Sequence, residues 1–266
     1  MLGARLEEAE PGPKYRGLDR LTGQVIRAVE RRGKFLVLPL ERNGERLDDL
    51  IIHLGMTGVL SSAPPERPSH LRVSVDLGGS GPAPVILGAE QADGSRLYFT
   101  DIRRFGRFLL TPAGDWQELP TLHAMGPEPL GAEFTPEGLA AAFTRSGSAV
   151  KTYLLSQRPV AGLGNIYVDE ALWRAGIHPQ TPASEVASER VAPLHAAIRA
   201  VLGASIRAQG TTLSDYRTVG GGEGGFQELL DVYGRTGQAC RRCGRELERI
   251  VLGGRSTHFC PDCQAR

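Results

Sequence analysis

All four cysteines of this 266-residue chain lie among its last 27 residues, as two Cys-x-x-Cys pairs. Cys240 and Cys243 form the first pair, Cys260 and Cys263 form the second, and 16 residues separate the pairs. This spacing is typical of a tetrahedral zinc site whose intervening residues form a hairpin. Two disulfides are the alternative, but each would close a small strained ring, and the sequence shows no signal peptide for an oxidising compartment. We therefore predict one structural Zn²⁺.

Arginines surround the predicted zinc ligands. A hairpin this small cannot bury a core, so the metal would hold its projecting side chains rigidly. The arginines beside the ligands are Arg241, Arg242, Arg245, Arg249 and Arg255, and Gly253-Gly254 predicts a turn just before the last of them. Guanidinium groups match the anionic oxygens of a phosphate backbone. A structural ribbon that binds no nucleic acid is the alternative at this point.

The overall charge does not indicate a binding partner, but the scarcity of lysine relative to arginine is informative. The formal net charge is only +1, so a nucleic-acid surface would require basic residues to gather on one face. Of the 31 basic residues only Lys14, Lys34 and Lys151 are lysines, and an ammonium acts as a compact donor that burial can deprotonate. No apolar run is long enough to cross a bilayer, so we expect a cytoplasmic protein without a membrane partner.

Residues 1–112 predict a β-domain. Short segments rich in Val, Ile, Leu and Phe alternate with turn residues such as Arg42-Asn43-Gly44-Glu45, which is typical of an antiparallel sandwich or barrel. The stretch Ser61–Ser69, with three prolines, predicts a loop. The expected strands are Gln24–Val29, Lys34–Leu40, Leu50–Leu54, Leu71–Leu77, Pro84–Leu87, Arg96–Phe99 and Gly106–Leu110.

The second half of the chain predicts helices. Residues 113–135 are rich in Pro and Gly and predict a linker, residues 136–235 a helical domain, and residues 236–266 the zinc finger. Thr135-Pro136-Glu137 is a helix start with a capping hydroxyl. The later helices are expected over Ala149–Gln157, Asn165–Ala175 and Ala187–Ala208.

A glycine-rich segment, Pro159–Asn165, joins two of these helices. Gly162 and Gly164 precede Asn165, which we expect to be the N-cap of the next helix. A bare helix start attracts anions, because its free N–H groups and the helix dipole both favour a phosphate. An ordinary helix–helix turn explains the segment equally well when it is taken alone.

Five segments in register resemble the bacterial formamidopyrimidine-DNA glycosylases, and the resemblance extends over nearly the whole chain from about Leu2. The matching segments are Leu50–Gly58, Asp101–Gly106, Ala161–Glu170, Gly210–Leu213 and the zinc hairpin. The resemblance implies an α+β fold with an N-terminal antiparallel β-sandwich, a helical domain with a helix–two-turn–helix, and a C-terminal zinc-finger β-hairpin. It also implies an enzyme of base excision repair that binds damaged double-stranded DNA, excises oxidised purines such as 8-oxoguanine and formamidopyrimidines, and nicks the abasic site by elimination. We expect a monomer, which would suit an enzyme that straddles a bent duplex.

The resemblance assigns residues to the DNA. Met56, Arg103 and Phe105 match the residues that fill the stack after a base is flipped out, which suits an apolar wedge, a ring and a guanidinium. Arg104 adjoins them, and His70 is a further candidate for DNA contact. The residues that match the phosphate clamp are Lys34, Asn165 and Arg255, of which Lys34 and Arg255 also match residues that assist elimination. Glu170 matches a helix acid near the site.

Two departures from the family pattern stand out. The family begins with a Pro whose amine attacks the sugar and a Glu that acts as an acid, whereas this chain begins Met1-Leu2-Gly3. We expect either a start assigned too far downstream or a damage-binding protein without glycosylase activity. In the loop Thr218–Phe226, which covers the flipped base in the family, Gly225 stands where a Tyr usually precedes the Phe, and this bears on lesion preference. Ile102 also replaces a usual Pro.

A third interpretation is a zinc-ribbon protein of transcription or translation. Such a protein would not need Met56, Arg103 and Phe105 together, so the sequence favours the repair enzyme. Incision of oxidised duplex DNA separates the enzyme from the damage-binding protein, and selective binding of damage separates both from the ribbon protein.

Overall fold

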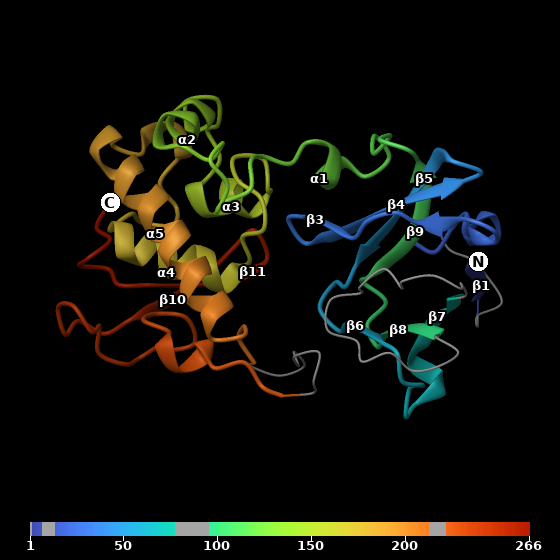
Figure 1. Ribbon diagram of the computed structural model, residues 1–266. Coiled ribbons are helices and arrows are strands. Elements are labelled where there is room, and N and C mark those ends of the chain that lie inside the picture. The colour runs from blue at the N-terminus through green and yellow to red at the C-terminus, as the bar shows by residue number, and fades with distance from the viewer. Residues whose placement is uncertain (1, 7–13, 78–95, 213–221) are drawn as a thin grey trace. The chain divides into compact units, whose positions relative to one another are not determined.

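The computed structural model of the chain describes residues 2–6, 14–77, 96–212 and 222–266. These residues form two compact units, the first built from residues up to His123 and the second from almost all described residues after it (Figure 1). Each unit has its own hydrophobic core.

Two antiparallel sheets make up the first unit. One has the strand order β1 (Leu2–Leu6), β7 (Leu71–Leu77), β8 (Arg96–Asp101), β6 (Gly58–Ser61). The other has the order β2 (Val25–Ile26), β4 (Phe35–Arg42), β5 (Glu45–His53), β9 (Arg107–Pro112), and β3 (Glu30–Arg32) pairs with β4. The short 3₁₀ helices η1 (Leu18–Leu21) and η2 (Pro68–His70) and the helix α1 (Pro120–His123) complete this unit.

The core of the first unit lies between the sheets. Alternate residues of β4 and β5 point into it, as the period of two in a pleated strand requires. Leu38 and Leu40 of β4, Leu50 and Ile52 of β5, and Phe99 of β8 belong to this single buried cluster. Two packed sheets make the unit a sandwich, so the barrel alternative is wrong.

The predicted strands are largely confirmed, and Leu71–Leu77 is confirmed to the residue. Three strands were not predicted: β1, β3 and β6. Strand β3 is the polar sequence Glu-Arg-Arg, and β6 has only four residues, so neither carries a recognisable apolar pattern. The expected strand Pro84–Leu87 lies outside the described residues, and the predicted linker contains the helix α1.

Four helices surround the core of the second unit: α2 (Pro136–Phe143), α3 (Val150–Leu155), α4 (Asn165–Ala175) and α5 (Ser188–Arg207). The predicted cap of α2 is confirmed, since the Thr135 hydroxyl accepts from the N–H of Gly138 at 3.1 Å. The short helix η3 (Ala183–Glu185) precedes α5. None of the described helices combines the length and apolar character that a bilayer-spanning segment requires.

The chain ends in the hairpin of β10 (Glu248–Leu252) and β11 (Arg255–Phe259), which packs against the helices. Leu252 pairs with Arg255 across a turn in which Gly253 and Gly254 have φ of 56° and 72°, so the predicted turn is confirmed. The short helix η4 (Phe226–Leu229) precedes the hairpin, and Phe226 is buried there against Tyr167. Residues 218–221 of the loop Thr218–Phe226 lie outside the described residues.

Candidate functional site

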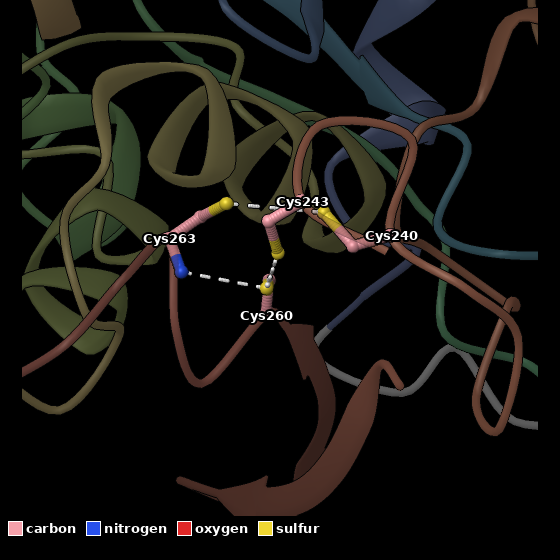
Figure 2. Close-up of side chains that lie close together, drawn as sticks. All are labelled: Cys240, Cys243, Cys260 and Cys263. Atoms are coloured by element: carbon pink, nitrogen blue, oxygen red, sulfur yellow. Dashed lines mark hydrogen bonds between the residues drawn. The ribbon is translucent and has the colours of Figure 1, made fainter. Parts of the chain in front are cut away.

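The four cysteine sulfurs converge at the open end of the β10–β11 hairpin (Figure 2). All lie within 4.8 Å of one another, with Cys240 Sγ 3.9 Å from Cys263 Sγ and Cys243 Sγ 3.4 Å from Cys260 Sγ. Four Zn–S bonds of about 2.3 Å in a tetrahedron would place the sulfurs roughly 3.8 Å apart. A disulfide needs about 2 Å, so the arrangement fits a metal and excludes the disulfide alternative.

Backbone amides stabilise the thiolates of this cluster. The N–H groups of Arg242 and Cys263 donate to Cys240 Sγ and Cys260 Sγ, each at 3.4 Å. Burial opposes ionisation of Cys240, but the bonds from the backbone of Arg242 and Cys243 lower its pKa to about 6. Burial raises the pKa of Cys260. A divalent cation offsets that cost, so the donor set fits Zn²⁺.

Three of the five hairpin arginines have partners within the protein. Arg241 pairs with Asp231 at 3.3 Å, Arg245 with Asp262 at 3.8 Å, and Arg242 stacks on Trp173 at 4.4 Å from the ring centroid. Arg255 is exposed at the start of β11. Among the described residues, no carboxylate forms an ion pair with it. Arg255 is thus better placed than these three for an external anion.

The carbonyl oxygen of Ser256, next to Arg255, gathers two donors from distant helices. Lys151 Nζ of α3 donates to it at 2.8 Å, and Asn165 Nδ2 of α4 donates to it at 2.9 Å. Lys151 is fully buried, and its ammonium pairs with Asp169 Oδ1 at 2.6 Å. Burial lowers the pKa of Lys151, and Asp169 opposes this. The hairpin turn that carries Arg255 is therefore attached to both helices.

Two carboxylates of α4 hold the neighbouring chain in place. Asp169 Oδ2 accepts from the backbone N–H of His258 at 2.9 Å. Glu170 accepts from the N–H groups of residues 231, 232 and 233, each at 2.9 Å, although burial raises its pKa. Glu170 therefore anchors the segment that leads into the zinc finger.

The expected N-cap role of Asn165 is wrong. Gly164 is the N-cap residue of α4, and Asn165 is the first residue of the helix. Its side chain bonds the Ser256 carbonyl instead of the helix start. Asn165 Nδ2 also donates its second hydrogen to the Tyr233 hydroxyl, over a longer distance of 3.5 Å.

In the first unit, two loops meet at one end of the sandwich. The pairing of β5 with β9 ends at His53 and Arg107, and the pairing of β6 with β8 ends at Gly58 and Asp101, which brings the loops 54–57 and 102–106 together. We call these two segments the tip loops. Met56 is 54 % exposed and Phe105 is 53 % exposed, so neither is a core residue. Exposed side chains of this size on one end of a domain point to a binding surface.

Glycines allow the tip loops to touch through their backbones. Gly55 has φ of 68°, and a Cβ added there would lie 2.8 Å from the nitrogen of Gly106. A Cβ on Gly106 would lie 2.9 Å from the carbonyl oxygen of His53. Both distances are below van der Waals contact, so the close approach of the loops requires glycine at both positions.

A lysine and a histidine lie beside the tip loops. Lys34 is exposed in the turn between β3 and β4, and His53 ends β5 with its ring 4.6 Å from that of Phe35. Burial first, and then the charges of Lys34 and Arg107, lower the pKa of His53 to about 4. His53 is therefore neutral at pH 7, and its Nδ1 accepts from the N–H of Gly55 at 3.2 Å.

Several of these residues were not predicted from the sequence. The predicted His70 lies half-buried at the end of η2, whereas the histidine beside Lys34 is His53. Lys14 Nζ donates to the carbonyl oxygen of Arg104 at 2.7 Å and lies 5.8 Å from the Phe105 ring centroid. The rarity of lysine in the sequence could have identified Lys14 and Lys151. Lys14 and Lys34 lie beside the tip loops and Lys151 supports the zinc hairpin, yet only Lys34 was assigned a role from the sequence.

Family models cover most of the chain. Residues 6–108 match the formamidopyrimidine-DNA glycosylase N-terminal domain and residues 125–217 match the formamidopyrimidine-DNA glycosylase H2TH domain. Residues 237–266 match the zinc finger found in FPG and IleRS. The last match and the sulfur geometry together confirm the predicted four-cysteine zinc site.

Whole proteins with similar sequences are also known. The formamidopyrimidine-DNA glycosylase of Deinococcus radiodurans is 43 % identical over 260 residues, which are 94 % of this chain and 86 % of that protein. The enzyme of the same name from Thermus thermophilus is 42 % identical over 253 residues, with the same two shares.

Solved structures agree with this similarity. The crystal structure of the MutM (FPG) protein from Thermus thermophilus matches with a TM-score of 0.81 and 42 % identity, covering 96 % of this chain and 88 % of that one. A complex between the Lactococcus lactis Fpg and an abasic site containing DNA matches with a TM-score of 0.78 and 33 % identity, covering 99 % and 92 %.

Proposed function

Since this chain belongs to the formamidopyrimidine-DNA glycosylase family, we propose that its tip loops and its zinc hairpin hold damaged duplex DNA while an oxidised purine is excised. The chain is a DNA glycosylase and abasic-site lyase of base excision repair with a four-cysteine zinc finger. What remains to be assigned is the part that its own residues play.

The tip loops are proposed to fill the gap that a flipped base leaves in the stack. An enzyme that reacts at the sugar of a damaged nucleotide must take the base out of the duplex, and apolar side chains commonly replace it. Met56 and Phe105 supply an aliphatic chain and a ring, and Arg103 supplies donors for the orphaned base. The single observation that carries this proposal is the exposure of Met56 and Phe105 on two loops joined backbone to backbone.

Phosphate binding is proposed for Arg255 and Asn165 in the second unit. Arg255 offers a guanidinium fork that forms no ion pair with the described carboxylates. Asn165 Nδ2 donates one hydrogen to the Ser256 carbonyl at 2.9 Å and the other to the Tyr233 hydroxyl at 3.5 Å, and a phosphate oxygen would replace the longer of these two bonds. Zn²⁺, when bound to the four cysteines, supplies no chemistry here but fixes the hairpin on which Arg255 stands. Lys151 and Asp169 act as supports of that hairpin.

Elimination at the abasic site leaves negative charge on the departing phosphate. A nearby cation stabilises that charge, and the exposed ammonium of Lys34 is the candidate in the first unit. His53 is neutral at pH 7, so it adds no second positive charge beside Lys34, but its ring N–H can donate a hydrogen bond to the phosphate. For the second elimination, which releases the phosphate on the other side of the abasic sugar, we assign the same stabilising role to Arg255.

Incision of defined duplexes tests the function. A duplex with 8-oxoguanine opposite cytosine should be nicked at the lesion, and the same duplex with guanine should remain intact. Lys34→Ala should retain lesion binding within about tenfold but lose most of the incision, because one charge-assisted contact is worth about that factor in affinity. Selective binding without any incision would instead indicate a damage-binding protein, and equal binding of both duplexes would contradict the whole proposal.

Two further expectations stay predictions. A monomer suits an enzyme that acts on one lesion at a time, and sedimentation in the absence of DNA tests it. A cytoplasmic protein associated with the nucleoid follows from the substrate, and imaging of a tagged chain tests that expectation.

A further inference from the structure

One buried carboxylate connects the two tip loops. Asp101, the last residue of β8, is fully buried. Its Oδ1 accepts from the Thr57 hydroxyl at 2.5 Å, and its Oδ2 accepts from the N–H of Gly106 at 2.6 Å. Thr57 follows Met56 and Gly106 follows Phe105, so the two exposed side chains stand next to the two groups that Asp101 binds.

The bonds continue beyond the carboxylate. The Thr57 hydroxyl also accepts from the N–H of Arg103 at 3.1 Å, which ties the start of the second tip loop to the first. Arg72, itself 4 % exposed, donates from Nε to the carbonyl oxygen of Asp101 at 2.8 Å. Arg104 between these anchors has φ of 55°, a conformation that a non-glycine residue keeps only when its surroundings enforce it.

We propose that Asp101, acting with Thr57, is a positioning residue that sets the separation of Met56 and Phe105 and so governs insertion into damaged DNA. This inference rests on the proposed role of the tip loops. In the proposed role, Asp101 does not itself contact DNA. The carboxylate is suited to the task because it offers two acceptor oxygens and no hydrogen, and each oxygen is occupied by a donor from a different loop.

A matched control exists in the same sandwich. Asp49 is equally buried, and its carboxylate accepts from the N–H of Gly114 at 2.9 Å and from Trp116 Nε1 at 3.1 Å. Those partners follow β9, at the opposite end of that strand from Gly106. Asp49→Ala therefore removes a comparable buried anchor without touching the tip loops.

The probe is a duplex that contains a tetrahydrofuran abasic analogue opposite 2-aminopurine. Wild-type protein should bind it more tightly than an undamaged duplex and change the 2-aminopurine emission on saturation. Asp101→Ala should lower the affinity for the abasic duplex by about tenfold or more, the loss expected for charge-assisted hydrogen bonds. It should leave the undamaged duplex within about twofold, because phosphate contacts are sequence-independent. The emission change at saturation should fall below half of the wild-type value.

Thr57 provides a second and milder test. Thr57→Val removes the hydroxyl without changing the shape, and it should reduce the abasic preference, whereas Thr57→Ser should restore it. The losses in Thr57→Val and Asp101→Ala should not add in the double variant, because both break one connection. If Asp101→Ala does not fold, the Val and Ser pair decides the question alone.

Each result has a definite meaning. An unchanged abasic preference in folded Asp101→Ala, or in Thr57→Val, overturns the inference while the proposed function stands. An equal loss of preference in Asp49→Ala also overturns it, since general loosening of the sandwich would then be the cause. A wild-type protein that does not prefer the abasic duplex contradicts the proposed function itself.

Discussion

At the residue scale, the Arg255 guanidinium is better placed for phosphate than Arg241, Arg242 and Arg245, which have partners within the protein. Arg255→Ala should weaken binding to damaged and undamaged duplexes alike, by about tenfold, because a phosphate contact carries no sequence information. The slope of log K against log salt should become shallower by about 0.9. Arg241→Ala is the control, since Arg241 already pairs with Asp231 and should change the slope less. Titrations by fluorescence anisotropy at several salt concentrations give both the affinity and the slope. An unchanged slope for Arg255→Ala would show that Arg255 does not contact a phosphate.

His53 should make the first unit sensitive to acid. Its folded pKa of about 4 lies below the ordinary value of 6.5, so the unfolded chain takes up a proton in this window that the folded chain refuses. The stabilisation is present above pH 6.5 and is lost as the pH falls towards 4, by about 2 kcal/mol between pH 7 and pH 5.

Urea unfolding at pH 7 and pH 5 measures this effect. His53→Gln should lose less stability between the two pH values than the wild type does. His123→Gln, at the exposed end of α1, is the control and should behave as the wild type. Equal losses in wild type and His53→Gln would show that other groups cause the acid sensitivity.

Which site residues could be predicted depends on how far along the chain each contact reaches. Met56 and Phe105 lie in recognisable local segments. The bond from Thr57 to Asp101 spans 44 positions, and the bond from Lys151 to the Ser256 carbonyl spans 105, so no local pattern contains both partners. Folded packing alone creates these pairs, which is why the sequence pointed to Asn165 as a helix cap and not as a support of the hairpin.

At the scale of elements, prediction succeeded where the local signal was strong. Helix α4 was predicted to the residue, because glycines bound it on both sides and its apolar residues repeat with a helical period. Strand β3 was missed because it pairs with β4 through its backbone and carries polar side chains. A pairing that depends on the backbone leaves little trace in the side-chain pattern.

The close approach of the tip loops is a property of whole elements and can be tested with one methyl group. Gly55→Ala places a Cβ in a positive-φ position and against the Gly106 nitrogen. Gly114→Ala is the matched control, because Gly114 has φ of 73° but no atom within 4 Å of an added Cβ. Both variants should lose about 1 kcal/mol to backbone strain, and Gly55→Ala should lose a further ~1–3 kcal/mol to the clash. Calorimetry of the two variants compares the losses; equal losses would mean that the loops separate freely.

At the scale of the whole molecule, the two units have separate cores, so damage to one should spare the other. The chain contains two tryptophans, one in each unit. Trp116 bonds Asp49 in the first unit, and Trp173 packs with Cys240 and Cys260 in the second. Tryptophan emission can therefore report on the units independently, provided that one indole is replaced at a time.

Loss of the metal gives the clearest test of this independence. Cys243→Ser leaves three thiolates, so zinc affinity should fall and the hairpin that carries Arg255 should loosen. DNA affinity should then fall by about tenfold or more, as for removal of a hot-spot arginine. With Trp116→Phe in the background, the Trp173 emission should shift to the red as its surroundings open to water. With Trp173→Phe instead, the Trp116 emission should be the same with and without Cys243→Ser, because the sandwich core contains no residue of the hairpin. A chelator added to the Trp116→Phe and Trp173→Phe proteins with all four cysteines intact should reproduce both signals. Retained DNA affinity after proven zinc loss would mean that the hairpin does not hold the duplex, and a simultaneous shift of Trp116 would mean that the two units unfold together.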